Sequence, residues 1–313
     1  MVQPGRKPAG STQRVLHGVI VAAFGRSYEV ATTDGRLQCT TRGKKNTFAC
    51  GDEVDVLPGA DGQGVIERLC PRRNLLWRSD AFREKLIAAN LSHIAIVVAT
   101  EPGFSDLLIS RCIAAAESQD ITPLIVLNKA DLADRLDAAR SQLAPFRALG
   151  YEVIELSALD GAQALRARLA GTHAIFVGQS GMGKSTLTNA LIPEAKAATR
   201  EISTALDTGK HTTTFARLYV FGEDLQRDGW LIDSPGLQAF GLAHLTPETL
   251  AESFLEFRPL LGECRFRDCR HEAEPGCALL AALASGAINA RRFEHFRTIR
   301  GEIAEAKRLN PGW

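Results

Sequence analysis

The stretch that decides the fold of this chain reads Gly178-Gln179-Ser180-Gly181-Met182-Gly183-Lys184-Ser185. It matches the pattern G-x-x-x-x-G-K-[ST], which follows a strand and opens a helix, and here it comes after the apolar run 174–177. The glycines allow the backbone to wrap around phosphate groups, whose charge meets N–H groups at the helix N-terminus. We expect a helix from Lys184 onward and assign these eight residues, with Thr186, to nucleotide binding. Lys184 would reach the β- and γ-phosphates, and Ser185 would coordinate Mg²⁺.

Short apolar runs occur on both sides of this loop, at residues 93–99, 124–127, 153–156 and 174–177. The segments between them, such as 106–118 and 133–149, are long enough for helices. Continuous apolar strands that alternate with helices indicate a parallel sheet covered on both faces. We therefore predict a central α/β domain of the P-loop class over residues 90–243.

A second motif, Asn128-Lys129-Ala130-Asp131, follows one of these runs, at the carboxyl end of a strand, where parallel sheets bind ligands. The Asp131 carboxylate can accept hydrogen bonds from N1–H and the exocyclic amine of guanine, whereas adenine offers no matching pair of donors. Lys129 can lie along the base, and Asn128 can tie this loop to the phosphate loop. Together with that loop, the motif predicts a guanine nucleotide.

The residues after the next apolar run complete the predicted base site. Ser157 and Ala158 follow the run 153–156, so they also lie at the carboxyl end of a strand. Their backbone N–H groups can donate hydrogen bonds to the guanine carbonyl. We include both residues in the nucleotide site.

Two further segments have the form and position of nucleotide switches. Asp233-Ser234-Pro235-Gly236 has the form D-x-x-G and follows a strand-like run. Asp233 would hold Mg²⁺ through water, and the Gly236 N–H would respond to the γ-phosphate. Upstream of it, Thr212 or Thr213 would coordinate Mg²⁺ in the GTP state, and the sequence does not choose between them.

The residue that orients the attacking water is not the usual one. Many switch GTPases place a glutamine directly after the D-x-x-G glycine, but this chain has Leu237 there. We assign the role to His211, which could orient water through a ring nitrogen, and group it with Lys184, Thr212 and Thr213 as catalytic residues. The alternative is a loop histidine with a structural or RNA-contacting role. The missing glutamine predicts slow intrinsic hydrolysis that a partner accelerates.

The motifs stand in circularly permuted order. Ordinary GTPases run from the phosphate loop through the switches to N-K-x-D and S-A, whereas here the last two come first. The segment that responds to the γ-phosphate therefore leads directly into the C-terminal part of the chain. Hydrolysis could then move a flanking domain by a hinge-type transition.

The N-terminal part reads as a small β domain. Residues 1–13 lack any periodicity and are expected to form a flexible tail. Residues 14–70 carry strand-like runs such as 18–23 and 27–32, separated by turns. This pattern predicts an oligonucleotide-binding (OB) type barrel, although an SH3-like barrel would leave the same pattern. Residues 71–89 read as a basic connector.

The C-terminal part, residues 244–313, reads as a helical domain interrupted by a cluster of metal-ligand residues: Cys264, Cys269, His271 and Cys277. Three thiolates and an imidazole are the donor set of a closed tetrahedral zinc site, which stabilises structure rather than performing catalysis. Arginines stand between the ligands and could contact phosphate groups once zinc pins the loop: Arg265, Arg267 and Arg270.

Composition and charge restrict the class of protein, its partners and its compartment. Hydrophobic residues make up 45% and charged residues 23% of the 313 residues, as in ordinary folded domains. Residues 1–75 have a net charge of +4 and residues 258–313 of +3, so that the middle carries −6 within a total of +1. Polyanion contacts would therefore belong to the flanks. Because no apolar run approaches membrane length and residues 1–13 lack a signal-like apolar stretch, we expect a cytoplasmic protein that binds no membrane.

Cysteine use fits that compartment. The chain has seven cysteines, an odd number that disfavours a closed disulfide framework. The four outside the C-terminal cluster are isolated in apolar or strand-like surroundings, where a thiol usually serves as a small buried side chain: Cys39, Cys50, Cys70 and Cys112.

In the order of its parts, the chain resembles the ribosome small subunit-dependent GTPase A family. The resemblance rests on the β domain, the permuted motifs and the cysteine cluster 264–277, and it covers essentially the whole chain after residue 13. It implies a GTPase that acts late in maturation of the small (30S) ribosomal subunit, is stimulated by that subunit and uses hydrolysis to time its release. It also implies contacts of the barrel and zinc domain with 16S rRNA. A histidine before the switch threonines, as at His211, belongs to the same resemblance. We expect GTP and GDP as ligands and a monomer.

Two other hypotheses come from the same residues. A pure binding module would hold the nucleotide as a structural or sensing ligand, although the combination of Lys184, Ser185 and Asp233 favours hydrolysis. A GTPase that serves translation or another RNA would keep the chemistry and change the partner.

Overall fold

A computed structural model of the chain describes residues 14–43, 48–195, 216–225, 227–234 and 240–310. Its central domain is built on a sheet with the strand order β10-β9-β8-β11-β13-β12. The first five strands in this order are parallel, and β12 pairs antiparallel with β13 at the far side. Their bounds are β8 (His93–Ala99), β9 (Thr122–Asn128), β10 (Glu152–Glu155), β11 (His173–Val177), β12 (Arg217–Val220) and β13 (Trp230–Asp233).

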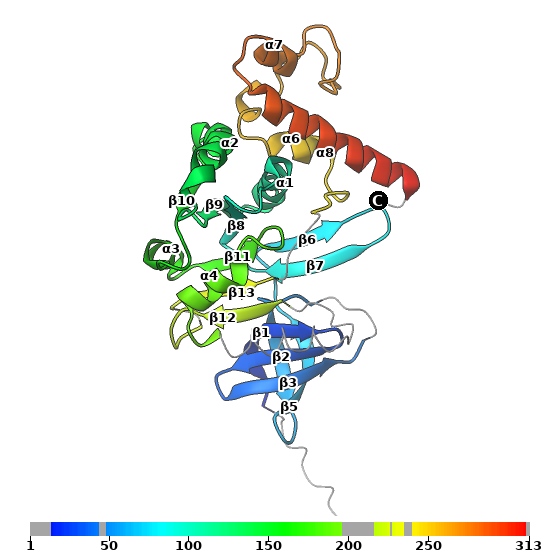
Figure 1. The fold of residues 1–313 in the computed structure, drawn as a ribbon. Helices are drawn as coiled ribbons and strands as arrows, with labels where there is room; N and C mark the ends of the chain where they lie inside the picture. Colours follow the sequence, from blue (N-terminus) through cyan, green and yellow to red (C-terminus); the bar gives the residue numbers. More distant parts are fainter. Residues whose placement is uncertain (1–13, 44–47, 196–215, 226, 235–239, 311–313) are drawn as a thin grey trace, which may run out of the picture.

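Helices cover both faces of this sheet (Figure 1). The helices α1 (Asp106–Glu117) and α2 (Leu136–Ala148, after the 3₁₀ turn η1, Ala133–Arg135) pack on one face, and α3 (Gln163–Leu169) and α4 (Lys184–Leu191) on the other. Strand β8 shows why both faces need cover. Ile94 and Ile96 belong to the first core and Ala95 and Val97 to the second, and all four are buried. The structure thus confirms the predicted α/β class.

The N-terminal domain is a closed five-stranded barrel. Its strands are β1 (Leu16–Phe24), β2 (Ser27–Thr32), β3 (Gly35–Thr41), β4 (Glu53–Pro58) and β5 (Gln63–Leu69). They follow the order β1-β2-β3-β5-β4, and β1 pairs again with β4 to close the barrel. The parallel pairing of β3 with β5 gives the Greek-key path of an OB-type barrel. The strand order therefore decides between the two barrel types that the sequence left open.

Barrel and central domain share one continuous sheet. Strand β12 pairs with β1 at Arg217 and Ala22, so that the pairings run through eleven strands. Beside this junction the Arg217 guanidinium donates to Glu29 on β2 at 2.8 Å. The barrel is thus joined to the central sheet by the β1–β12 strand pairing as well as by the chain, and β12 lies next to β1 in Figure 1.

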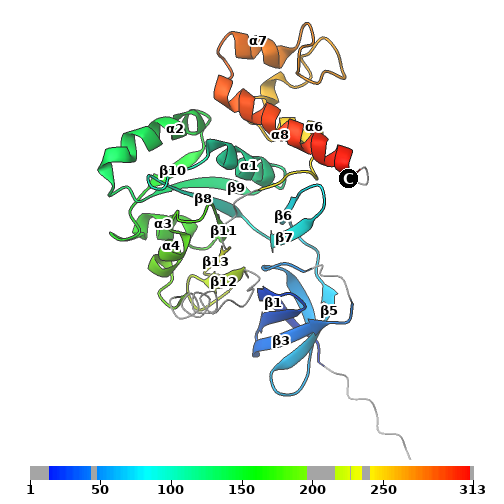
Figure 2. The ribbon, with the colours of Figure 1, turned by 45° about the vertical axis from the view of Figure 1, so that its right-hand side comes forward.

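The segment 71–89, which reads as a connector, contains a two-stranded hairpin. Strands β6 (Leu75–Ser79) and β7 (Glu84–Ala89) pair antiparallel around the turn 80–83. The basic residues of this segment suggested an exposed linker. Two of its apolar residues, Leu76 and Ile87, are nevertheless buried in the main core. The hairpin lies between the barrel and the C-terminal helices (Figures 1 and 2).

The C-terminal domain is helical, as expected, with α6 (Pro247–Glu252), the 3₁₀ turn η2 (Arg258–Leu260), α7 (Ala278–Ala284) and α8 (Ala290–Leu309). A group of aromatic rings joins α8 to the segment after α6: Phe254, Phe257, Phe293 and Phe296. None of the helices in the described parts of the chain is both long and apolar enough to cross a membrane.

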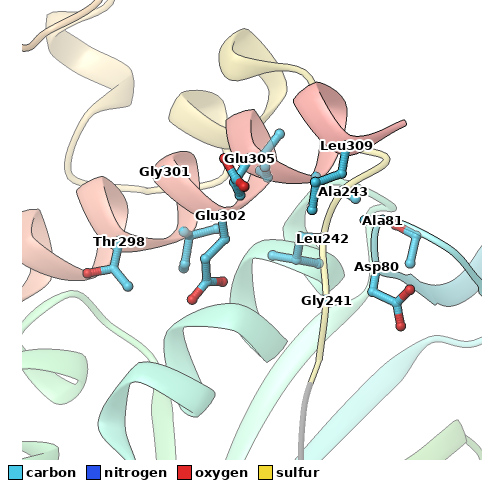
Figure 3. A pocket seen from close by; sticks show the side chains of 14 residues that line it. Asp80, Ala81, Gly241, Leu242, Ala243, Thr298, Gly301, Glu302, Glu305 and Leu309 are labelled. Carbon is cyan, nitrogen blue, oxygen red and sulfur yellow. The ribbon is translucent and has the colours of Figure 1, made fainter. Parts of the chain in front are cut away.

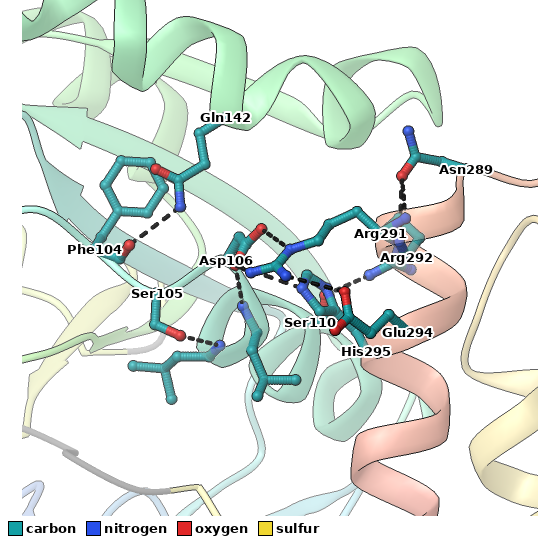
Figure 4. Close-up of polar contacts among 12 residues, drawn as sticks. Phe104, Ser105, Asp106, Ser110, Gln142, Asn289, Arg291, Arg292, Glu294 and His295 are labelled. Carbon is teal, nitrogen blue, oxygen red and sulfur yellow. Dashed lines mark hydrogen bonds and ion pairs between the residues drawn. The ribbon is translucent and has the colours of Figure 1, made fainter.

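Helix α8 is attached to α1 by ion pairs and hydrogen bonds (Figure 4). The Arg291 guanidinium donates to both carboxylate oxygens of Asp106 at 3.0 and 3.1 Å. The buried Arg292 donates to Ser110 Oγ at 2.7 Å and pairs with Glu256 at 2.8 Å. Arg291 and Arg292 of α8 thus contact Asp106 and Ser110 of α1, so that polar contacts join the C-terminal helices to the central domain.

Candidate nucleotide site and candidate metal centre

The glycine-rich loop connects β11 to α4, and α4 begins at Lys184 as the sequence predicts. Two of its glycines sit where a side chain would collide. A Cβ on Gly178 would lie 2.2 Å from the Val97 carbonyl oxygen, and one on Gly183 would lie 2.3 Å from Asn128 Nδ2. Both also have positive φ angles, +146° and +87°, which L side chains rarely adopt. The loop can therefore pass this close to the sheet edge only with glycine at these positions.

Lys184 is buried, and its ammonium group is held by the loop itself. Nζ donates to the Gly178 carbonyl at 2.9 Å and to the Gln179 carbonyl at 2.8 Å. Burial lowers the pKa of Lys184, whereas the nearby Asp233 carboxylate raises it. A positive charge fixed at the centre of a loop of N–H groups is the arrangement that binds phosphate. Around it, Ser180, Gly181, Ser185 and Thr186 are exposed.

Asn128 brings three separate motifs together. Its Nδ2 donates to the Met182 carbonyl in the phosphate loop at 2.9 Å, and its Oδ1 accepts from the Ala158 N–H at 3.0 Å. The Asn128 side chain is buried, so its amide needs these partners. The N-K-x-D, S-A and phosphate-loop segments thus meet at the carboxyl edge of the sheet.

The residues predicted to contact the base differ in exposure. Asp131 is exposed and Ser157 is buried, while Lys129 and Ala158 are partly buried. The Ser157 hydroxyl accepts from the Leu159 N–H at 3.3 Å, which shapes the turn after β10. The described structure thus leaves the Asp131 carboxylate open to a ligand.

A loop after β8 also borders the site, and the motifs gave no sign of it. The Thr100 hydroxyl donates to the Lys129 carbonyl at 2.9 Å, and Lys129 Nζ donates to the Glu101 carbonyl at 2.6 Å. The Ser105 N–H donates to the Gln179 side chain at 3.2 Å. In the sequence, only the position of this loop could have indicated its role, because it follows the carboxyl end of a parallel strand, where such sheets bind ligands.

The predicted Mg²⁺ ligands Ser185 and Asp233 lie together. Ser185 Oγ is 3.5 Å from Asp233 Oδ2, at the end of β13. Burial raises the pKa of the Asp233 carboxyl to about 6, although the Lys184 ammonium group lowers it. A hydroxyl and a carboxylate at this distance could hold one Mg²⁺, which prefers oxygen ligands.

Several predicted switch residues lie outside the described parts of the chain: His211, Thr212, Thr213 and Gly236. The described chain resumes at residue 240, where it runs along the hairpin. The Ser79 N–H donates to the Gly241 carbonyl at 3.1 Å, the Ala243 N–H donates to the Ser79 carbonyl at 3.3 Å, and the His244 N–H donates to Ser79 Oγ at 2.9 Å. The His244 ring stacks on Trp77 with centroids 4.1 Å apart.

A cavity of about 470 Å³ lies beside this attachment, between the hairpin turn, residues 241–243 and α8 (Figure 3). Leu242, Ala306 and Leu309 form an apolar part of its lining, which also includes the acidic residues Asp80 and Glu302. None of the residues predicted to bind nucleotide lines this cavity. It therefore belongs to the contact between hairpin and C-terminal domain.

The four C-terminal ligand candidates converge on one point. Each residue offers one ligand atom, and these four atoms all lie within 4.8 Å of one another: the sulfur atoms of Cys264, Cys269 and Cys277 and a ring nitrogen of His271. His271 Nδ1 is 3.6 Å from Cys264 Sγ and 3.3 Å from Cys277 Sγ. Zinc–sulfur and zinc–nitrogen bonds of about 2.3 and 2.0 Å place such atoms about 3.5 Å apart in a tetrahedron. The cluster fits a tetrahedral metal ion.

Glu274, which sequence reasoning missed, shapes the loop around this cluster. Its carboxylate accepts from the N–H groups of Arg270, Glu272 and Ala273 at 2.9, 2.8 and 3.1 Å. Hydrogen bonds from its own and these backbone N–H groups lower the pKa of Glu274 to about 2. Burial lowers the pKa of His271, which favours the neutral ring that binds metal. The interleaved Arg265, Arg267 and Arg270 are exposed.

Comparisons with known proteins agree on one family. The family profile described as RsgA GTPase matches residues 69–243. The small ribosomal subunit biogenesis GTPase RsgA of Burkholderia pseudomallei is 53% identical over 308 residues, which cover 96% of this chain and 97% of that one. The protein of the same name from Bordetella pertussis is 54% identical over 294 residues, covering 93% and 97%.

Solved structures show the same architecture. The crystal structure of YjeQ from Thermotoga maritima superposes with a TM-score of 0.70 at 28% identity, covering 93% of this chain and 99% of that one. YloQ, described as a circularly permuted GTPase, superposes with a TM-score of 0.68 at 26% identity, covering 95% and 98%.

Proposed function

Since the chain belongs to the RsgA GTPase family and is therefore a GTP-hydrolysing enzyme, we propose that it acts in biogenesis of the small (30S) ribosomal subunit. In this proposal the subunit stimulates hydrolysis of GTP to GDP and phosphate, and hydrolysis times release of the protein late in maturation. The observation that carries the GTPase part of the proposal is the Asn128 side chain, which ties the N-K-x-D, S-A and phosphate-loop segments into one site. The names of the 53–54% identical relatives support the choice of partner.

The proposed roles follow the geometry of the site. Asn128, Lys129, Asp131, Ser157 and Ala158 hold the guanine base, and residues 178–186 hold the phosphates. Ser185 and Asp233, 3.5 Å apart, hold Mg²⁺ together with Thr212 or Thr213. When bound, Mg²⁺ supplies charge neutralisation for the phosphate groups. Gly236 senses the γ-phosphate.

The flanking domains give the proposal its mechanical output. The tail 1–13, barrel 14–70, connector 71–89, GTPase domain 90–243 and zinc domain 244–313 form the proposed division. Residues 241–244 follow the D-x-x-G segment and are hydrogen-bonded to Ser79 of the hairpin. A rearrangement that starts at Gly236 would therefore reach the hairpin and the C-terminal helices within a few residues. We propose that barrel and zinc domain contact 16S rRNA and that the monomeric protein works in the cytoplasm.

The partner is tested by measuring phosphate release from GTP and from ATP, with and without purified small subunits. We expect GTP turnover that rises on addition of small subunits and no comparable turnover of ATP. Competition binding against large subunits and transfer RNA tests the alternative of a GTPase that serves translation or another RNA. Such a protein would bind one of those competitors more tightly than the small subunit.

His211→Ala is expected to retain GTP binding and to lose subunit-stimulated turnover, because removal of the imidazole leaves the attacking water unoriented. Loss of a general acid–base or water-orienting group typically lowers the rate by about 100- to 10,000-fold. Nucleotide binding by fluorescence titration and stimulated single-turnover hydrolysis measure the two quantities separately. Full stimulation in this variant would remove His211 from the mechanism.

Cys269→Ser is expected to lower zinc content by about one equivalent per chain, because the Cys₃His set then lacks one ligand. The loop 264–277 should become sensitive to protease, since metal binding and local folding are coupled. Intrinsic GTP hydrolysis should persist, because the nucleotide residues lie in another domain. Asp268→Asn, at an exposed neighbour that offers no ligand to the cluster, is the control, and equal zinc content in the two variants would contradict the site.

A further inference from the structure

A second group of possible metal ligands lies on the barrel. His17 on β1, Asp55 on β4 and Cys70, directly after β5, place one ligand atom each within 4.8 Å of the other two. His17 Nδ1 is 3.4 Å from Asp55 Oδ1 and 3.9 Å from Cys70 Sγ, and the latter two atoms are 4.0 Å apart. The imidazole, carboxylate and thiol groups therefore lie close together beside the neighbouring strands β1, β4 and β5.

The backbone fixes this grouping. His17 and Asp55 are directly paired in the β1–β4 ladder that closes the barrel. Cys70 is held beside them by its N–H, which donates to the Glu53 carbonyl at 2.9 Å. Directly opposite residues of an antiparallel pair have Cβ atoms about 5 Å apart, so the His17 and Asp55 side chains meet without any distortion of the strands.

The distances suit a tetrahedral ion. Bonds of about 2.0 Å from zinc to nitrogen and oxygen and about 2.3 Å to sulfur place neighbouring ligand atoms about 3.3–3.6 Å apart. The His17–Asp55 distance of 3.4 Å already has that value. The two distances to sulfur, 3.9 and 4.0 Å, come into range with a small rotation of the Cys70 side chain. Nitrogen, oxygen and sulfur donors together favour zinc over calcium or magnesium.

Two neighbours hold the ligand atoms in a binding orientation. Glu53 Oε2 lies 3.5 Å from His17 Nε2, and a carboxylate on the second ring nitrogen is the usual partner of a metal-binding histidine. Arg68 donates to Asp55 Oδ2 at 2.8 and 2.6 Å, which leaves Oδ1 facing the histidine and the thiol. These contacts account for the carboxylate and the imidazole, but they do not account for the thiol.

Cys70 also differs from the other cysteines outside the C-terminal cluster. Cys39, Cys50 and Cys112 are buried, as expected, whereas Cys70 is partly exposed. The His17 side chain is 49% exposed, so an ion can reach the group and water can complete its coordination. We propose that His17, Asp55 and Cys70 bind one zinc ion, with water as fourth ligand, and that this ion fastens the β1–β4 seam of the barrel.

The test is the zinc content of the full chain after equilibration in a zinc-buffered solution and removal of free metal. The wild-type protein should hold about two equivalents, one at the Cys₃His cluster and one on the barrel, and Cys70→Ser and His17→Gln should each hold about one. Asp55→Asn is compared with Asp61→Asn, which removes the same charge at the exposed β4–β5 turn. Only Asp55→Asn should weaken zinc retention.

A wild-type content of about one equivalent, or an unchanged content in Cys70→Ser and His17→Gln, would overturn the proposal. Hydrogen exchange gives a second measurement that does not depend on how well a variant retains metal during purification. Addition of zinc should slow exchange of the β1 and β4 amides in the wild-type chain and not in His17→Gln, because a ligand that binds only the folded state suppresses its opening. Equal exchange with and without zinc in the wild-type chain would also overturn it.

Discussion

Lys184→Ala is expected to lower the rate of intrinsic GTP hydrolysis by on the order of 100- to 1,000-fold, the usual effect of removing one donor that stabilises transition-state charge. The ammonium group is buried and fixed by the Gly178 and Gln179 carbonyls, so no solvent-exposed side chain can take its position. Its removal also leaves Asp233 without the nearby cation that lowers its pKa, and Mg²⁺ binding should weaken as well. Single-turnover hydrolysis at saturating GTP and Mg²⁺ measures the effect.

The matched control for this lysine is Lys85→Ala. Lys85 is an exposed residue of β7 in the hairpin and has no place in the nucleotide site. The Lys85→Ala variant should hydrolyse GTP at the same intrinsic rate as the wild-type chain. A Lys184→Ala protein that hydrolyses GTP at the wild-type rate would show that the glycine-rich loop does not bind the transferred phosphoryl group.

Asp131→Asn is expected to exchange one base preference for another. The carboxylate would accept two hydrogen bonds from guanine, each worth about 1.5–3 kcal/mol when one partner is charged, so GTP affinity should fall by on the order of 100- to 10,000-fold. Xanthine carries a carbonyl where guanine has its amine, and an asparagine amide can donate to that carbonyl. The variant should therefore bind xanthosine triphosphate more tightly than GTP, as competition titration can measure.

Asp134→Asn, at an exposed position in η1, provides the control for loss of one negative charge in the same loop. It should keep the wild-type preference for GTP. Unchanged GTP affinity in Asp131→Asn, or equal affinity of the wild-type chain for GTP and ATP, would contradict the assignment of the base site to Asp131.

Local sequence patterns predicted much of the fold. Strand β8 occupies residues 93–99 and β2 residues 27–32, as their apolar or alternating patterns indicate. The hairpin β6–β7 was missed, because its apolar runs are short and stand among basic residues that are typical of a linker. The choice between barrel types was also out of reach, since it depends on the parallel pairing of β3 with β5, a contact between strands far apart in sequence.

The site divides in the same way. Motifs with fixed spacing identified Asn128 and Lys184, whose neighbours in the structure are the segments that the motifs imply. Thr100 and Ser105 reach the site through a hydroxyl and a backbone N–H, and such contacts leave no residue pattern to read. The expectation that Cys70 is buried was wrong, because its neighbours His17 and Asp55 lie more than a dozen residues away along the chain.

The continuous sheet has a consequence for dissecting this protein into pieces. Removal of the barrel would uncover the edge of β12, where Arg217 is now paired with Ala22 of β1, and an exposed strand edge can pair with strands from other molecules. Such a shortened protein should aggregate rather than behave as an isolated GTPase. The same pairing places Asp233, at the end of β13, only two strand pairings from the barrel. Tension applied to the barrel would therefore reach Asp233, a predicted magnesium ligand, through sheet hydrogen bonds, without passing through any loop.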